Sequence, residues 1–277
     1  MPPEGPALHP RNRAFAWSVP PGPKRIVDAE SLRAWSDRGY LLLRAAFRPA
    51  EVAELLAEID PIEERVAGAV RRQPGGKVFI AEDGNITFST LLVKHSQRLR
   101  RFAHHRVFRD LAHDLVGPDV RLYWDQAVYK KPERPGVFPW HQDNGYTYIE
   151  PQQYLTCWIA LTDATRVNGC PVVAPGLHRL GTLAHRMTDA GWQCLDSDPP
   201  DAVAVEAPAG SIVVLSSLTP HKTGPNLTND VRKAYIVQFA PEGAVAWRAG
   251  NDAPTPQRDA EHQFAILCSG APAEPPP

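Results

Sequence analysis

Residues 120–129 read VRLYWDQAVY, and at this stretch the hydrophobic pattern of the chain changes. Before it, apolar residues recur at helical spacing. From it onward they gather in short β-branched or aromatic runs bounded by Gly, Pro, Asn or Asp, which is typical of strands. Further strands are predicted at 154–161, 171–174, 202–205, 211–215 and 234–239. Helices followed by many short strands predict an antiparallel β-sandwich or barrel that N-terminal helices support.

Three helices are predicted ahead of these strands. Asp28 begins the first and Gly39 ends it, and a short strand at 40–43 follows. Apolar residues at helical spacing, with acidic residues between them, predict an amphipathic helix over 49–71. A third helix is predicted over 99–115, before a Gly-Pro pair. The fold class is therefore mainly β with flanking helices.

The chain is long enough for one large domain and has 29 prolines, many of them near its ends. Residues 1–24 carry repeated prolines and little apolar periodicity, so we expect a proline-rich irregular leader. Residues 25–268 are expected to form a single domain. Residues 269–277 read SGAPAEPPP, and we expect this proline-rich tail not to pack.

Composition and charge exclude several classes of protein. Lys and Arg number 30 against 31 Asp and Glu, so nothing favours nucleic acid or an anionic membrane surface as a partner. No apolar run approaches the ~20 residues that cross a bilayer. The four cysteines show no Cys-x-x-Cys spacing, and the N-terminus lacks a secretory pattern. We expect a soluble, cytoplasmic protein whose partner is a small molecule. Its oligomeric state is not legible from the sequence.

A candidate metal site lies at Trp140-His141-Gln142-Asp143. On an extended segment, the side chains of His141 and Asp143 point to the same face, so both could reach one ion. A chance His-x-Asp pair is common in a chain with ten histidines, and on its own a structural role is the better explanation. His221, which follows Pro220 at the end of a predicted strand, is the best third ligand. Two imidazoles and a carboxylate leave positions open on Fe(II) for a keto acid and oxygen.

Arg232 makes this pattern specific. It follows His221 by eleven residues, on the next predicted strand, after a turn-rich connection. Such a return would place Arg232 in the same barrel mouth as His221, where a guanidinium can bind a carboxylate through two charge-assisted hydrogen bonds. Thr223 can add a hydroxyl hydrogen bond. An interior Arg without a partner would be unfavourable, although an Arg at a strand start is more often solvated.

Five segments carry a family resemblance: RGYLLLRAAF, WDQAVYKKP, WHQDNGY, CWIALTDATRVNGCPVVAPGLHR and APAGSIVVLSSLTPHKTGPNLTNDVRKAY. In their order and spacing they resemble the phytanoyl-CoA dioxygenase family of Fe(II)/2-oxoglutarate oxygenases. The resemblance covers nearly the whole chain apart from its ends. It implies a double-stranded β-helix core, a jelly roll of the cupin-like kind, supported by the N-terminal helices.

The resemblance also implies roles for individual residues in binding iron and 2-oxoglutarate. The implied iron ligands, which are also the catalytic residues, are His141, Asp143 and His221. The residues implied to bind 2-oxoglutarate are Arg232 at its distal carboxylate, Thr223 beside it, the aromatic Trp158, and Gln126 and Lys130 on the strand that lines the cofactor pocket.

Asn144, Tyr146 and Tyr148 follow the ligand pair, and they are interpreted either as substrate-binding residues at the mouth or as loop packing. The resemblance implies hydroxylation of a C–H bond, with O2 and 2-oxoglutarate consumed and succinate and CO2 released. Acyl thioesters, amino-acid derivatives and secondary metabolites are all possible substrates. Because Asp143 is a carboxylate, halogenation is disfavoured, whereas desaturation or ring formation stays open.

Two functions of other classes also fit parts of the pattern. One is a cupin-like metalloenzyme that uses the three ligands without 2-oxoglutarate, and Arg232 and Thr223 argue against it. The other is a non-catalytic binding module of the same fold, and an intact set of three ligands argues against that.

Overall fold

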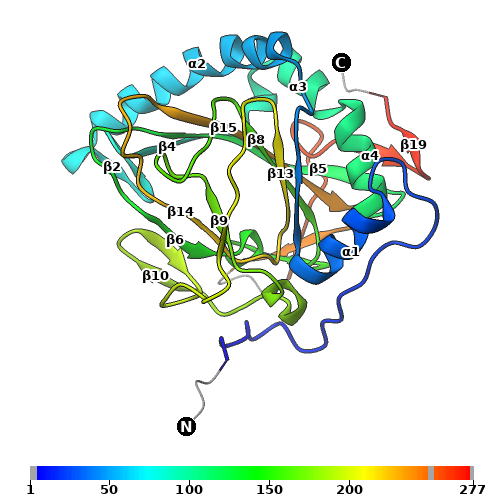
Figure 1. Cartoon of the computed structure of the whole chain (residues 1–277). Coiled ribbons are helices and arrows are strands. Elements are labelled where there is room, and N and C mark those ends of the chain that lie inside the picture. The colour runs from blue at the N-terminus through cyan, green and yellow to red at the C-terminus, as the bar shows by residue number, and fades with distance from the viewer. Residues whose placement is uncertain (1–4, 249–252, 275–277) are drawn as a thin grey trace.

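The computed structural model describes residues 5–248 and 253–274 (Figure 1). Two antiparallel sheets face each other, which confirms the predicted fold class. The major sheet runs in the order β1 (Tyr40–Leu43), β13 (Ile212–Ser216), β8 (Leu155–Ala160), β15 (Arg232–Pro241), β5 (Val120–Lys130), β4 (Ile86–Thr90), β3 (Ala81–Glu82) and β2 (Lys77–Val78). The minor sheet runs in the order β12 (Val203–Ala204), β9 (Pro171–Val173), β14 (His221–Thr223) and β6 (Phe138–His141).

Smaller elements extend these two sheets. Strand β18 (Ala265–Cys268) pairs with β5 and with β19 (Ala271–Pro272). A hairpin is formed by β10 (Arg186–Thr188) and β11 (Gly191–Gln193), and a three-stranded sheet by β17 (Thr255–Pro256), β16 (Val245–Trp247) and β7 (Tyr148–Glu150). The 3-10 helices are η1 (Pro74–Gly76), η2 (Leu92–Lys94), η3 (Asp143–Gly145) and η4 (Leu177–Leu180).

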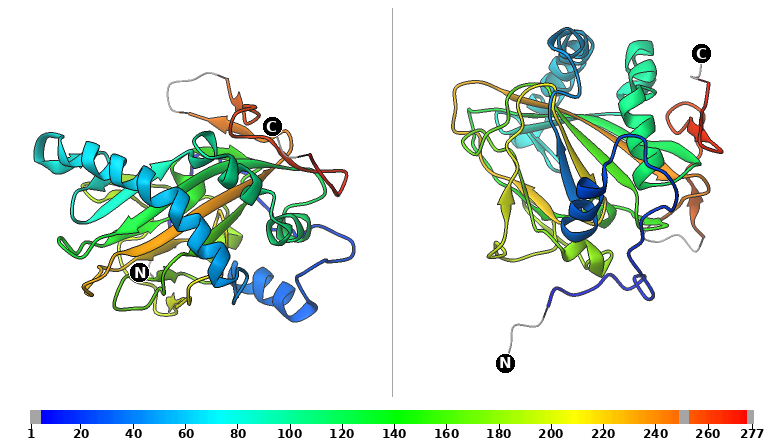
Figure 2. Two further views of the ribbon diagram at one scale, coloured as in Figure 1. Left: turned by 90° about the horizontal axis from the view of Figure 1, so that it is seen from above. Right: turned by 45° about the vertical axis from the view of Figure 1, so that its right-hand side comes forward.

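The first two helices begin where the sequence predicts. In α1 (Ala29–Arg38), the Asp28 side chain accepts a hydrogen bond from the Ser31 amide, and Gly39 ends the helix in the left-handed region at φ 78°. Helix α2 (Pro49–Arg71) begins with proline, which lacks the amide hydrogen that would be unpaired there. Figure 2 shows α2 lying across the outer face of the major sheet, where its apolar side packs.

The predicted helix at 99–115 is wrong as a single element. The structure divides it into α3 (Gln97–Ala103) and α4 (Arg106–Leu115). The break lies at His104 and His105, where the His105 ring nitrogen accepts a hydrogen bond from the Val107 amide and so begins a second helix. A side chain that bonds to nearby backbone offers an alternative to a continuous helix, which apolar spacing alone does not reveal.

Two apolar layers hold the molecule together. The larger lies between the helices and the major sheet and includes Trp35, Ile59 and Phe108. The smaller fills the space between the two sheets, around Trp158 and Val213. The second layer is where the site is built, because side chains of both sheets point into it. Within the described residues, no helix combines the length and apolar character needed to cross a membrane.

The described parts of the leader and the tail, residues 5–24 and 269–274, pack more than the proline content indicates, and the rest of both segments lies outside the described residues. The leader is irregular, yet Asn12 is buried. Its side-chain Nδ2 donates to the backbone carbonyls of Leu180 and Thr182. The tail was expected not to pack, but β19 pairs with β18, and the Gly270 amide donates to Pro118 O at 2.8 Å. Backbone hydrogen bonds of this kind need no apolar side chain, so composition does not predict them.

Asp114 ties the start of the domain to α4. This fully buried carboxylate accepts hydrogen bonds from the amides of Arg25, Ile26 and Val27 at 2.9 to 3.0 Å, and His113 Nδ1 lies 3.0 Å from it. Burial acts to raise the pKa of Asp114, but these hydrogen bonds outweigh burial and hold it below its usual value. The stabilisation is therefore present above the unfolded-state pKa and is lost as pH falls through the folded-state pKa.

We expect Asp114→Ala to lower the free energy of unfolding by about 2 to 3 kcal/mol, because three buried amides lose a charged acceptor. Chemical denaturation at pH 7 measures the change. Asp110→Ala on the same helix is the control, since its carboxylate bonds to the exposed Arg106 side chain and should cost at most about 1 kcal/mol. Equal losses in the two variants would contradict this account.

Candidate metal centre and active site

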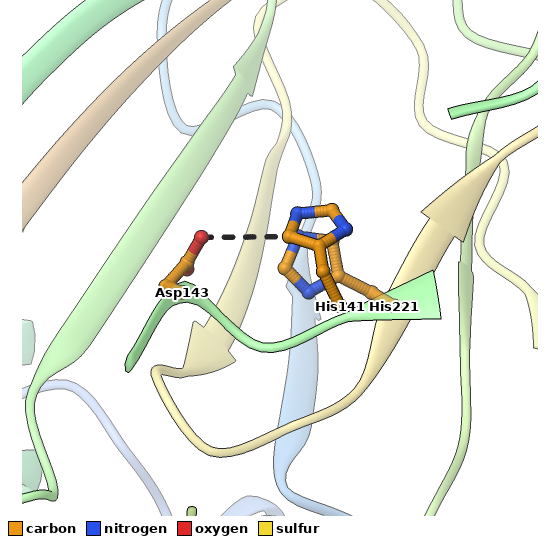
Figure 3. Close-up of side chains that lie close together, drawn as sticks. All are labelled: His141, Asp143 and His221. Atoms are coloured by element: carbon orange, nitrogen blue, oxygen red, sulfur yellow. Dashed lines mark ion pairs between the residues drawn. The ribbon is translucent and has the colours of Figure 1, made fainter. Parts of the chain in front are cut away.

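Strand pairing brings the two predicted histidine ligands together. In the β6–β14 pair, His141 is the direct cross-strand partner of His221, and their ring centroids lie 4.1 Å apart. Asp143 begins η3 immediately beyond β6, and its Oδ1 lies 4.0 Å from His221 Nε2 (Figure 3). One ligand atom from each residue can be chosen so that all three lie within 4.8 Å of one another. This spacing suits a single ion.

Gln142 explains why the two ligands that flank it face the same way. It is extended, at φ −107° and ψ 145°, and fully buried. Its side-chain Nε2 donates to Gly181 O and Leu218 O. Its side-chain Oε1 accepts a hydrogen bond from the Leu183 backbone amide at 2.6 Å. Because these bonds hold Gln142 away from the ion, the residues on either side of it project toward the ion.

Backbone carbonyls orient both imidazoles. His141 Nδ1 donates to Pro139 O at 2.8 Å, and His221 Nδ1 donates to Thr219 O at 3.1 Å. With the proton on Nδ1, each Nε2 keeps a lone pair for the metal. Burial, and next the neighbouring His221, hold the pKa of His141 well below its usual value. That residue is therefore neutral, as a metal ligand must be.

The carboxylate ligand is held by two residues that the sequence analysis did not identify. Thr156 Oγ1 donates to Asp143 Oδ2 at 2.5 Å, and Gln238 Nε2 donates to Thr156 Oγ1 at 3.1 Å. The two strands pair so that Gln238 lies opposite Thr156. The only local signal is that each is a polar residue flanked by apolar residues in a strand.

Arg232 lies inside the barrel, as predicted. Its side chain is 1% exposed, and its guanidinium carbon lies 5.2 Å from the centroid of a Trp158 ring. Among the described residues, none accepts a hydrogen bond from its Nε, Nη1 or Nη2. Burial lowers the pKa of Arg232 to about 10, so the group is still a cation at neutral pH. An unpaired buried cation is unfavourable unless an anion completes the site.

Lys130 is the cross-strand partner of Arg232 but is already bonded. Its Nζ donates to Gly136 O at 2.7 Å, to Thr223 Oγ1 at 3.1 Å, and to the carbonyls of Thr223 and Gly224. Burial, and next the charge of Arg232, lower the pKa of Lys130 to about 7. Lys130 therefore links β5 to β14, since its Nζ bonds to Thr223 while its backbone lies opposite Arg232.

The residues present fit iron and a keto acid. His141, Asp143 and His221 form a two-histidine, one-carboxylate set that leaves one face of an ion open. Thr223 lies two residues beyond His221 on β14. Its hydroxyl accepts a hydrogen bond from Lys130, the cross-strand partner of Arg232. These donors suit a diacid with a keto acid at one end, because an ion would bind the keto acid and the unpaired guanidinium would bind the far carboxylate.

A cavity of about 750 Å3 opens beside His141 and Asp143. Gln126 and Tyr146 are both in its lining. Gln126 lies beside the ligand pair, four residues along β5 from the partner of Arg232.

Asn144 and Tyr148, also predicted at the mouth, are corrected. Asn144 is fully buried and donates to Thr182 Oγ1, and the Tyr148 hydroxyl donates to Arg11 O in the leader. Neither residue is in the lining of the cavity, so both match the alternative of loop packing.

Fold and site together define an Fe(II)- and 2-oxoglutarate-dependent oxygenase. The model of the phytanoyl-CoA dioxygenase (PhyH) family matches residues 35–234, and the chain belongs to this family. The match includes every iron ligand and Arg232. The protein is therefore an enzyme that uses iron and 2-oxoglutarate. This sets aside both alternatives that the sequence left open, the cupin-like metalloenzyme without 2-oxoglutarate and the non-catalytic module.

Individual relatives are distant. The chain is 29% identical over 155 residues to a phytanoyl-CoA dioxygenase of Arabidopsis thaliana, a match that spans about half of each protein, 54% and 55%. It is 25% identical over 234 residues to a probable alpha-ketoglutarate-dependent hypophosphite dioxygenase of Stutzerimonas stutzeri, which covers 79% and 80% of the two chains. The different names show that relatives at this distance differ in substrate.

Solved structures agree with the fold. The carbocyclase SnoK from nogalamycin biosynthesis superposes with a TM-score of 0.71 over 89% of this chain and 100% of its own, at 21% identity. EvdO2 from Micromonospora carbonacea var. aurantiaca, solved with 2-oxoglutarate, superposes with a TM-score of 0.62 over 84% of this chain and 97% of its own, at 26% identity.

We expect Thr156→Val to weaken Fe(II) binding by 10- to 100-fold, the usual effect of removing a partner that orients a metal ligand. The change removes the hydroxyl that donates to Asp143 and keeps the size of the side chain. Anaerobic titration with Fe(II) measures the affinity, and Thr156→Ser, which keeps the hydroxyl, is the control. Unchanged affinity in Thr156→Val would show that this hydrogen bond does not orient the ligand.

Proposed function

We propose that this enzyme hydroxylates a C–H bond of a small-molecule substrate. One oxygen atom of O2 enters the substrate as a hydroxyl, and the other enters succinate as 2-oxoglutarate is oxidised and loses CO2. Bound iron and 2-oxoglutarate together activate O2 for this reaction. The observation that supports the proposal most strongly is the buried, unpaired guanidinium of Arg232 within the same barrel as the three iron ligands.

We assign the distal carboxylate of 2-oxoglutarate to Arg232. A planar guanidinium with free Nη1 and Nη2 donors matches a carboxylate through two parallel hydrogen bonds. Thr223 supplies a neighbouring hydroxyl, and Trp158 supplies an apolar wall under the guanidinium. Lys130 holds β14 in place and does not bind 2-oxoglutarate directly, because its Nζ already donates to oxygens of Gly136, Thr223 and Gly224. Gln126 is assigned to the iron end of the site.

Hydroxylation is favoured over halogenation by Asp143. Its carboxylate lies at the metal position and is fixed by Thr156, so it occupies a coordination site that a halide would need. Desaturation or ring closure would use the same residues and would differ only in the geometry of the substrate.

We also propose that residues 25–268 form a single catalytic domain that works in the cytoplasm. The cysteines support a reducing compartment, since Cys157 and Cys170 are buried free thiols and Cys194 and Cys268 are free as well.

We expect Arg232→Met to raise the Kd for 2-oxoglutarate at least tenfold, because the distal carboxylate loses a charge-assisted bidentate partner. Isothermal titration calorimetry of the Mn(II)-loaded protein measures this without turnover. Lys233→Met is the matched control, since Lys233 follows Arg232 on β15 but pairs with Asp60 at 2.9 Å.

Lys233→Met should bind 2-oxoglutarate as the unchanged protein does. If Arg232→Met also kept its affinity while remaining folded by thermal denaturation, the assignment of Arg232 would be wrong.

A further inference from the structure

The cavity beside the iron ligands has an apolar wall. Its volume of about 750 Å3 suits a drug-sized molecule. Most of its lining residues lie on the last turns of α2, on the β2–β3 segment and on strands β4, β5 and β6, and Trp192 adds the β10–β11 hairpin. Its aromatic lining residues include Phe88, Phe138, Tyr123, Trp124, Tyr154 and Trp192. Rings of this kind bind apolar molecules by area and by stacking.

Formal charge is nearly absent from this wall. Among the described residues that line the cavity, only Asp143 is charged, and iron binding uses its carboxylate. The part of the chain that the structure describes contributes no lysine or arginine to the lining. The exposed Arg248 lies outside it, although its charge opposes the rise in the pKa of Tyr123 that burial and Asp143 cause. The wall therefore offers no cation to a carboxylate, phosphate or phosphonate.

Neutral hydrogen-bonding groups do reach the cavity. The Gln126 side-chain oxygen accepts from Trp124 Nε1 at 3.2 Å, and no described residue accepts from its NH2 group. Thr90 and Thr147 add hydroxyl groups to the lining. Donors of this kind recognise an acceptor oxygen on an otherwise apolar molecule, such as a ketone, ether or alcohol.

The entrance is apolar as well. Val78 and Phe79 line the cavity yet are 46% and 60% exposed, and Phe79 has a positive φ of 52°. Together Val78 and Phe79 form a contiguous exposed apolar surface at the cavity, which is a feature of ligand-binding sites. Ala69, on the exposed side of α2, completes the rim and leaves room beside it.

We propose that the substrate is an uncharged, largely apolar molecule that carries a hydrogen-bond acceptor. The inference rests on the proposed hydroxylation and narrows its substrate class. A molecule that places a carboxylate, phosphate or phosphonate inside the cavity does not match the lining. The apolar skeleton would bury against α2 and the aromatic residues, with its C–H bond held at the open face of the iron.

The test compares two probes of nearly equal size on the anaerobic holoenzyme with Fe(II) and 2-oxoglutarate. One is 2-acetonaphthone, which is neutral and carries an acceptor oxygen, and the other is 2-naphthoate, which is anionic. Binding is read from the change that each probe causes in the visible charge-transfer band of the Fe(II)–2-oxoglutarate complex. We expect the neutral probe to bind at least tenfold more tightly.

Two tryptophan variants locate the binding. Ala69→Trp fills the rim and should weaken 2-acetonaphthone binding at least tenfold. Ala57→Trp, at an exposed position of α2 outside the lining, should leave it unchanged. Three results would overturn the proposal. Neither probe binds, the anion binds as tightly as the ketone, or Ala69→Trp leaves the affinity for 2-acetonaphthone unchanged. Absence of the charge-transfer band before any probe is added would instead overturn the proposed function.

Discussion

The antiparallel pairing of β6 with β14 is the constraint on which the site depends. It places His141 opposite His221, and the buried Gln142 then turns Asp143 toward the same point. Each imidazole is oriented by a carbonyl two residues before it, so the strands fix both the positions and the proton positions of the ligands. A register shift of one residue would move a histidine to the other face of the sheet and remove the site.

The second requirement is a cation held deep in the barrel without a protein partner. Arg232 is stabilised by the ring of Trp158, while Lys130 beside it is satisfied by protein oxygens. The protein therefore carries one buried guanidinium whose hydrogen bonds a ligand can complete, and this arrangement couples stability to co-substrate binding. The apolar cavity lies on the iron side of the site. If the two proposals hold, 2-oxoglutarate and the substrate meet surfaces of opposite character, a buried cation and a set of aromatic rings.

Sequence reasoning identified the parts of the site that are encoded by spacing and missed those encoded by cross-strand register. The ligands and Arg232 stand at fixed intervals in the chain, so they could be predicted. Thr156 and Gln238 meet only because β8 and β15 pair, which no local pattern shows. For Asn144 the sequence left mouth and loop packing open, and the structure shows this residue buried in a 3-10 turn after Asp143, with its side chain bonded to Thr182. The fold class followed from the order of helices and strands, whereas the break between α3 and α4 depends on a side-chain cap.

The central claim is that the three ligands and Arg232 form one site for iron and a keto acid. The most direct test is the anaerobic absorption spectrum of the Fe(II)-loaded protein during titration with 2-oxoglutarate. The account predicts a broad visible metal-to-ligand charge-transfer band that saturates at one equivalent and that succinate does not produce. Tight Fe(II) binding with no such band at saturating 2-oxoglutarate would contradict it.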